Sequence, residues 1–406
     1  MNKGLIISGI AAVLIGIGIN EAFIKNDIKD FQLFEKAPMP AAEFTQSTIS
    51  EKATYVESIK NDKIVISEQS IKVAFLLDTS GSMNGLIEQA KSQLWQILNQ
   101  LATATTENGQ WPQIEIALYE YGKSDATNSI RKLSDLTKDM DFISEQLFAL
   151  TTNGGNENCG EVIMTSLDEL TWGEDEKDLK LIFIAGNEPF SQGPVNYVTA
   201  VKKANQREIY VNTIFCGDHE RGYENHWARG AKLGGGEYMN IDHNTVTAYI
   251  PTPHDKKITK LNSKLNSTYV PYGKNGKEKA KNQKLQDKNA SSYSQSNAAE
   301  RAIFKSSVNY QANDWDLVDA YKKDPTILDN INDLPEAYQG MSKEELIAQI
   351  QMKSNERAQV QNEIRKHHVE RIKYLKKNRN DDKNLSNSIR KSLEAQAKRK
   401  GYRLGE

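Results

Sequence analysis

The sequence has little cysteine, little proline and no strong excess of charge of either sign. Only 2 of its 406 residues are Cys and 10 are Pro. Lys and Arg together number 52 and Asp and Glu 54, so the formal net charge is −2. This balance gives no global reason to expect nucleic acid or another polyanion as partner. The pattern Gly-x-x-x-x-Gly-Lys-Ser/Thr is absent, which excludes a P-loop ATPase.

An uncharged run follows Lys3 and extends from Gly4 to Ile19. Its length and its preceding positive charge are typical of a secretory signal or a short membrane anchor. Residues 1–20 are therefore predicted to be a signal anchor or a signal peptide. An uncleaved anchor with Lys3 inside places the protein in the cell membrane as a single-pass N-in chain facing the periplasm or exterior. Cleavage would instead give a secreted or periplasmic protein.

The hydrophobic pattern changes after a polar linker or stalk over residues 21–69. Apolar strand patterns then alternate with helical patterns across residues 70–250. The predicted strands are 73–77, 114–121, 129–133, 179–185, 210–216 and 238–241. Such alternation predicts an α/β fold with a doubly wound, mostly parallel six-stranded sheet.

The remainder of the chain is polar. Residues 251–340 are predicted to form a partly helical extension, in which 273–296 are either a loose helix or disordered. Residues 341–406 are predicted to form a charged helical tail. This tail is either a solvated helix packed on the domain or an interaction arm, for example a coiled coil.

One loop carries residues suited to metal chemistry. Asp78 ends the first apolar strand, and Ser80 and Ser82 follow at alternate positions before a helix. This spacing places one carboxylate and two hydroxyls on one side of a tight turn, and Gly81 allows the backbone to fold closely. Hard cations such as Mg²⁺ prefer oxygen ligands of this kind.

The sequence Asp78-Thr79-Ser80-Gly81-Ser82 resembles the metal-ion-dependent adhesion site of the von Willebrand factor type A family, in particular an uncharacterised bacterial, membrane-anchored branch. The family adds a Thr from a second loop, which here matches Asn156, or Thr152 if the loop is offset. It also adds an Asp after the fourth strand, which falls on Gly186 or Asn187. Asn187 is the preferred oxygen donor.

The resemblance implies a divalent cation, Mg²⁺ first and Ca²⁺ or Mn²⁺ as alternatives, and a protein partner that supplies an acidic side chain to the cation. Because amides replace charged or hydroxyl ligands, we expect weak cation binding without the partner.

The predicted function is therefore a cation-dependent protein-binding module of the cell envelope. The alternatives are an accessory subunit of an AAA-type ATPase complex for metal insertion or assembly, and a metal-independent envelope scaffold. Enzyme activity is not expected, because no Ser or Cys has a matched base and orienting group.

The two cysteines, Cys159 and Cys216, lie near the predicted binding edge of the sheet. They form either one disulfide, which an oxidising compartment would permit, or two independent thiols.

Overall fold

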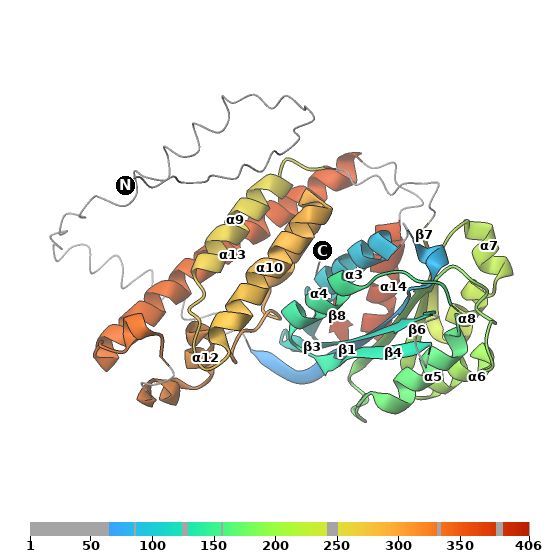
Figure 1. Cartoon of the computed structure of the whole chain (residues 1–406), viewed down its shortest axis with the longest axis horizontal. Helices are drawn as coiled ribbons and strands as arrows, with labels where there is room; N and C mark the ends of the chain where they lie inside the picture. Colours follow the sequence, from blue (N-terminus) through green and yellow to red (C-terminus); the bar gives the residue numbers. More distant parts are fainter. Residues whose placement is uncertain are drawn as a thin grey trace, which may run out of the picture. The chain divides into compact units, whose positions relative to one another are not determined.

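The α/β part of the protein is built around one six-stranded sheet (Figure 1). The computed structural model describes residues 65–84, 87–123, 129–155, 157–241, 251–330, 334–378 and 385–405. The strands are β1 (Ile66–Asp78), β3 (Trp111–Tyr121), β4 (Ile130–Thr137), β5 (Leu179–Gly186), β6 (Ile209–Cys216) and β7 (Gly235–Ile241). Their order is β4-β3-β1-β5-β6-β7; β4 is antiparallel to β3, and the other neighbours are parallel. The predicted doubly wound, mostly parallel sheet is confirmed.

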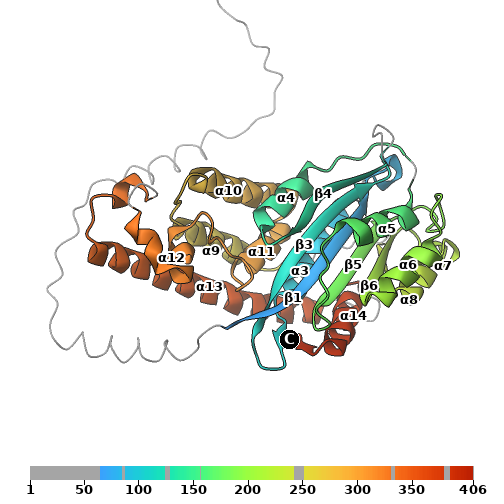
Figure 2. The ribbon, with the colours of Figure 1, turned by 90° about the horizontal axis from the view of Figure 1, so that it is seen from below.

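The central strands are apolar because helices cover both faces of the sheet (Figure 2). Every residue of β5 and β6 is buried, which requires cover on both sides since successive side chains alternate between faces. One face packs against α5 (Cys159–Glu169), α6 (Tyr197–Gln206) and α8 (Trp227–Leu233), and the other against α3 (Ile87–Leu101) and α4 (Met140–Ala149). Two short helices, α7 (His219–Glu224) and α8, precede the last strand, and His226 between them has a φ of 69°.

The polar region after the sheet folds into helices. They are α9 (Asp255–Ser267), α10 (Gly276–Tyr293), α11 (Gln295–Lys305), α12 (Leu317–Lys323) and α13 (Lys343–Asn378), with short 3-10 turns at Pro325–Asp329 and Glu336–Tyr338. Figure 1 shows α9, α10 and α13 running alongside one another. The segment 273–296, for which disorder was one interpretation, is helical over most of its length.

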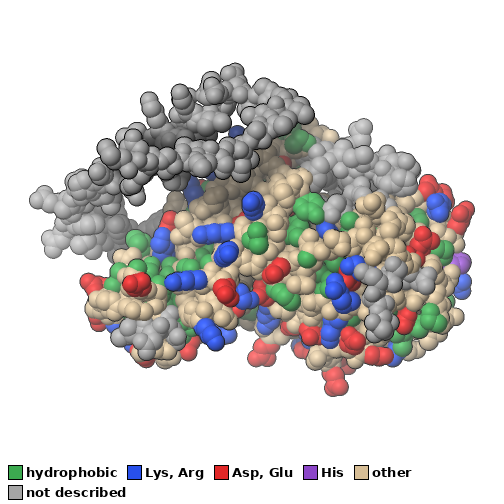
Figure 3. Space-filling model, in the orientation of Figure 1, with side chains coloured by type: hydrophobic (Ala, Val, Ile, Leu, Met, Phe, Trp, Pro, Cys, Tyr) green, Lys and Arg blue, Asp and Glu red, His purple; other side chains and the backbone are tan. Residues whose placement is uncertain are grey.

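Buried ion pairs connect these helices, in addition to the apolar contacts between them. Arg371 on α13 lies 2.6 Å from Asp255 on α9 and 2.8 Å from Glu300 on α11. Arg301 on α11 pairs with Asp141 on α4. Removing one member of such a pair leaves an uncompensated buried charge, which is strongly destabilising. The pairs therefore help to determine which helices lie together, and the Arg301–Asp141 pair joins α11 to a helix of the α/β part. The outer surface is different: on the face shown in Figure 3, side chains of both charges are interspersed.

The last helix, α14 (Leu385–Arg399), packs on the sheet rather than extending away as part of a tail. Ile389, Leu393 and Ala397 are buried in the core that lines the α3 face of the sheet. Asn212, fully buried in β6, forms a reciprocal amide pair with Gln396 of α14, with N···O distances of 3.1 and 2.7 Å. Beyond α14, β8 (Tyr402–Arg403) pairs with β2 (Thr105–Thr106).

The predicted domain boundaries change accordingly. The α/β domain predicted over residues 70–250 is completed by residues 385–405, so 341–406 is not one separate tail. Its first part, α13, instead packs against α9 and α12. The alternative in which the tail packs on the domain agrees with the structure. The division into α13 and α14 was not predicted, because a polar helix far along the chain carries no local signal of its docking site.

The predicted membrane segment, residues 1–20, and most of the linker over 21–69 lie outside the described residues. Within the described ranges, no helix combines the length and apolar character needed to cross a bilayer.

We predict that Gln396→Met destabilises the protein by about 1–3 kcal/mol, because it leaves the buried Nδ2 of Asn212 without the acceptor that Gln396 provides. Lys398→Met, an exposed position on the same helix, is the matched control and should change stability little. Denaturant unfolding of the purified protein measures both. Equal stability of the two variants would show that α14 does not occupy this site.

Candidate functional site

The candidate site begins at Asp78, whose side chain is fully buried at the carboxyl end of β1. The chain then passes through Ser80 into one 3-10 turn, η1 (Gly81–Met83). The backbone N–H of Asn153 in the second loop donates to the carbonyl of Thr79 at 2.9 Å, so the two loops are joined directly. Ligands of open α/β sheets bind at this edge, beyond the carboxyl ends of the strands.

A chain of hydrogen bonds links the polar side chains of the first loop to the loop after β5. The hydroxyls of Ser80 and Ser82 lie 2.9 Å apart, and the Ser82 hydroxyl donates to Asn187 Oδ1 at 3.0 Å. Ser82 is exposed, whereas Ser80 and Asp78 are buried, so the site is open on the Ser82 side. The structure thus brings together four of the five residues predicted as cation ligands; the fifth, Asn156, lies outside the described residues.

Gly186 has a different role from its neighbour Asn187. A Cβ at Gly186 would lie 3.1 Å from Asp78 Oδ2 and 2.7 Å from the hydroxyl of Tyr121. A side chain at this position would therefore push against the carboxylate itself. The sequence left either Gly186 or Asn187, in the loop after β5, as the oxygen donor. The structure places Asn187 beside the serine hydroxyls.

Asp78 is a carboxylate in an unfavourable environment. Its Oδ1 accepts a hydrogen bond from the Ser80 N–H at 2.7 Å, but its buried Oδ2 accepts none from the described residues. Burial raises the pKa of Asp78 to about 7, and the nearby Glu157 carboxylate adds to the rise. The N–H and the hydroxyl of Ser80 and the N–H of Asn187 lower the pKa of Asp78 in part. The Asn187 N–H does not form a hydrogen bond with Oδ2.

Glu157 is a site residue that our sequence analysis missed. It lies in the second loop, and its side chain is buried. Its Oε2 accepts a hydrogen bond from Gln192 Nε2 at 3.2 Å. Burial raises the pKa of Glu157, which the Ser80 hydroxyl partly offsets by hydrogen bonding. The sequence signal for Glu157 is its position directly after Asn156, which matches the Thr of the family pattern.

These residues are chemically suited to a hard divalent cation. Carboxylate, hydroxyl and amide oxygens are the donors that Mg²⁺, Ca²⁺ and Mn²⁺ prefer. The unpaired Oδ2 of Asp78 is a buried anionic oxygen of the kind that a cation would stabilise. In the described part of the chain, no group of three or more His, Cys, Asp and Glu side chains forms a metal site. The candidate site therefore depends on serine and amide oxygens beside its carboxylates.

The possible disulfide between Cys159 and Cys216 is not formed. Both residues are buried free thiols. Cys159 on α5 belongs to the core on one face of the sheet, and Cys216 at the end of β6 points into the core on the other face. The sheet thus separates them, and burial raises the pKa of both thiols, which keeps them protonated. Cys159 instead lies 3.6 Å from the hydroxyl of Tyr121.

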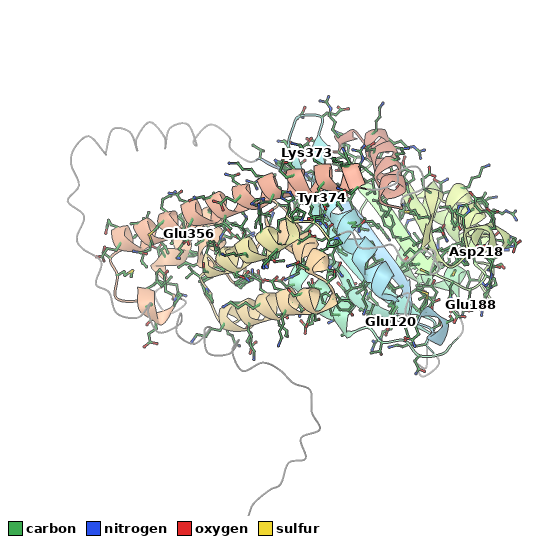
Figure 4. All side chains as sticks on the ribbon, turned by 90° about the horizontal axis from the view of Figure 1, so that it is seen from above. Glu120, Glu188, Asp218, Glu356, Lys373 and Tyr374 are labelled. Carbon is green, nitrogen blue, oxygen red and sulfur yellow. The ribbon has the colours of Figure 1, made fainter. Side chains whose placement is uncertain are left out.

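Two acidic residues, Glu188 and Asp218, follow the carboxyl ends of β5 and β6. Glu188 follows Asn187, and its negative charge contributes to the raised pKa of Glu157. Asp218 caps the N-terminus of α7 after β6, where its side chain accepts from the N–H groups of Glu220 and Arg221. Figure 4 shows Glu188 and Asp218 at the same end of the α/β domain.

The sequence model of the von Willebrand factor type A domain matches residues 72–224. The chain contains a von Willebrand factor type A domain. Such domains are commonly protein-interaction modules with a metal-ion-dependent adhesion site, and the Asp78–Ser82 loop lies where that site is expected. A comparison with curated proteins gave no match.

Several solved structures are similar to this chain. The conserved hypothetical protein BatB from Bacteroides thetaiotaomicron is 17% identical over 43% of this chain and 91% of its own, with a TM-score of 0.33. An aerotolerance-related membrane protein from Bacteroides fragilis is 18% identical over 44% and 94%, with a TM-score of 0.30. Proximal thread matrix protein 1 from the mussel byssus, with a zinc-occupied MIDAS motif, is 13% identical over 49% of each chain, with a TM-score of 0.33.

We predict that Asp78→Asn stabilises the cation-free protein at pH 8. The folded-state pKa of about 7 lies above the ordinary value of 3.8, so folding favours protonated Asp78. Cation-free wild type should therefore lose stability as the pH rises from about 4 to about 7 and remain at the lower level above it. Asparagine carries no charge, so the variant should be more stable than wild type at pH 8, by up to about 4 kcal/mol for a pKa shift of this size.

Denaturant unfolding in the presence of a chelator, at pH 5 and pH 8, measures this difference. Asp135→Asn, at an exposed carboxylate in β4, is the matched control. A variant less stable than wild type at pH 8 would contradict the prediction.

Proposed function

We propose that this protein is a cation-dependent protein-binding module that acts at the cell envelope through the carboxyl edge of its von Willebrand factor type A domain. The observation that carries the proposal is the convergence of Asp78, Ser80, Ser82 and Asn187, with one buried Asp78 oxygen that lacks a hydrogen bond from the described residues. A buried, unpaired carboxylate costs stability, and such a cost is commonly retained at functional sites.

In this proposal, the cation is Mg²⁺, or Ca²⁺ or Mn²⁺, and it supplies a positive centre that attracts an oxygen ligand. Asp78 balances its charge from the buried side. The hydroxyls of Ser80 and Ser82 and the amide oxygen of Asn187 hold the neutral ligand positions. Ser82 is exposed, so a protein partner approaches on that side and contributes an acidic side chain.

Binding without catalysis is part of the proposal. The Ser82 hydroxyl donates to an amide oxygen rather than to a general base. The Cys159 thiol is buried beside Tyr121, and its raised pKa keeps it from acting as a nucleophile at neutral pH. The side chains of this site are therefore better suited to holding an ion than to attacking a substrate.

The envelope location rests on the uncharged run Gly4–Ile19 after Lys3. A chain anchored by this run with its N-terminus inside would present the von Willebrand factor type A domain to the periplasm or exterior. A topology reporter fused to the C-terminus tests this location. Activity of the reporter in the cytoplasm would favour the accessory subunit of an ATPase complex over the envelope module.

We predict that the full chain captures a protein from envelope extract in the presence of Mg²⁺, and that Asp78→Ala or a chelator abolishes the capture. The reason is that Asp78 provides the buried negative charge of the site. Asp329→Ala, which removes an exposed carboxylate paired with Lys343, is the matched control and should capture normally. Affinity purification followed by mass spectrometry measures the result.

A partner captured equally by wild type and Asp78→Ala, with or without Mg²⁺, would contradict cation-dependent binding. It would support the metal-independent scaffold instead.

A further inference from the structure

We propose that Glu157 is a second carboxylate ligand of the cation in this site, an inference that rests on the proposed function. The family pattern assigns no ligand to this position of the second loop. The inference follows from the placement of Glu157 beside Asp78 and Ser80, from the charges that surround it, and from the neutral character of Asn187.

Glu157, Asp78 and Ser80 converge around Gly122, which follows β3. Gly122 has a φ of 84°, and a Cβ there would lie 2.7 Å from Asp78 Oδ1, 3.3 Å from Glu157 Cγ and 3.3 Å from Ser80 Cβ. The three side chains therefore surround one small volume that only glycine leaves open. Glu157 therefore lies against Ser80 and Asp78 of the first loop.

The two carboxylates have no cationic side chain to compensate them within the described residues. Lys123, which follows Gly122, pairs with Glu120 at 3.2 Å, and Arg131 pairs with the same carboxylate. The hydrogen-bond partner of Glu157 is the neutral amide of Gln192, which does not compensate its charge. Two buried negative charges so close together disfavour each other, and a divalent cation is the simplest species that would neutralise both.

Glu157 also changes the expected charge of the site. Counting only the predicted ligands gives one carboxylate, because Asn187 and Asn156 are neutral, and that count led to the expectation of weak cation binding. With Glu157, the site offers two negative charges to a cation of charge +2. We therefore expect cation binding by the free protein, before any partner arrives.

The test compares wild type, Glu157→Gln and Glu161→Gln by isothermal titration with MgCl₂, MnCl₂ and CaCl₂, and by thermal unfolding of the full chain. Glu161 lies on α5 and accepts from Asn158, so its variant is a matched control in the same segment. We expect Glu157→Gln to weaken cation binding about tenfold or more, since removal of a charged ligand lowers affinity. The control should bind as wild type does.

Thermal unfolding separates a ligand from a merely structural residue. With a chelator, Glu157→Gln should melt at or above the wild-type temperature, because it removes a repulsive buried charge. With saturating cation, the variant should gain less stability than wild type. A lower melting temperature in chelator together with unchanged cation affinity would overturn the inference. Glu157→Asp keeps the charge on a shorter side chain and should bind better than Glu157→Gln.

The outcomes for the two proposals are distinct. If wild type binds a cation, Asp78→Ala does not, and Glu157→Gln binds as wild type does, the Glu157 inference is wrong and the proposed function stands. If wild type binds none of the three cations, the proposed cation dependence itself fails, and with it the role of Glu157.

Discussion

The buried carboxylate of Asp78 is the constraint around which the binding edge of this protein is arranged. β1 lies between β3 and β5 and carries Asp78 to a position where water does not reach it. A charge in such a place must be paired, neutralised or stabilised by dipoles. The neighbouring loops meet this requirement only in part, through the Ser80 N–H.

The glycines beside the carboxylate show how closely the loops approach it. A Cβ at Gly122 or at Gly186 would come within 2.7 and 3.1 Å, respectively, of an Asp78 oxygen. The backbone of two loops therefore encloses the carboxylate, and the serine and Asn187 side chains leave one exposed side. The enclosure of the Asp78 carboxylate therefore costs folding free energy, and the exposed side leaves its loop open to a ligand.

The fold could be predicted from the sequence because its signals are local. Runs such as 179–185 and 210–216 are apolar throughout, which is characteristic of strands covered on both faces, and the helices between them determine a parallel arrangement. Asp78, Ser80 and Ser82 could be recognised because their spacing has a geometric reason. The register of the third loop, by contrast, depended on backbone geometry that a sequence does not contain.

Other features could not be predicted because they depend on contacts between distant segments. Glu157 is significant only because Gly122 and Ser80 lie against it. The separation of Cys159 and Cys216 follows from the faces that α5 and β6 present, which sequence proximity to the rim did not reveal. The helices after residue 251 are held by pairs such as Arg371–Asp255, whose partners are far apart in the chain. A hydropathy pattern therefore underestimates their order.

The return of α14 to the sheet has a consequence for the biogenesis of the protein. Asn212 in β6 pairs with Gln396, and β2 pairs with β8, so the core on the α3 face of the sheet is completed by segments that lie far along the chain. During synthesis, α14 and β8 can take these places only after the intervening helices α9 to α13 have been made. Until then the apolar face that α14 covers would be exposed, and exposed apolar surface makes incomplete chains prone to aggregation.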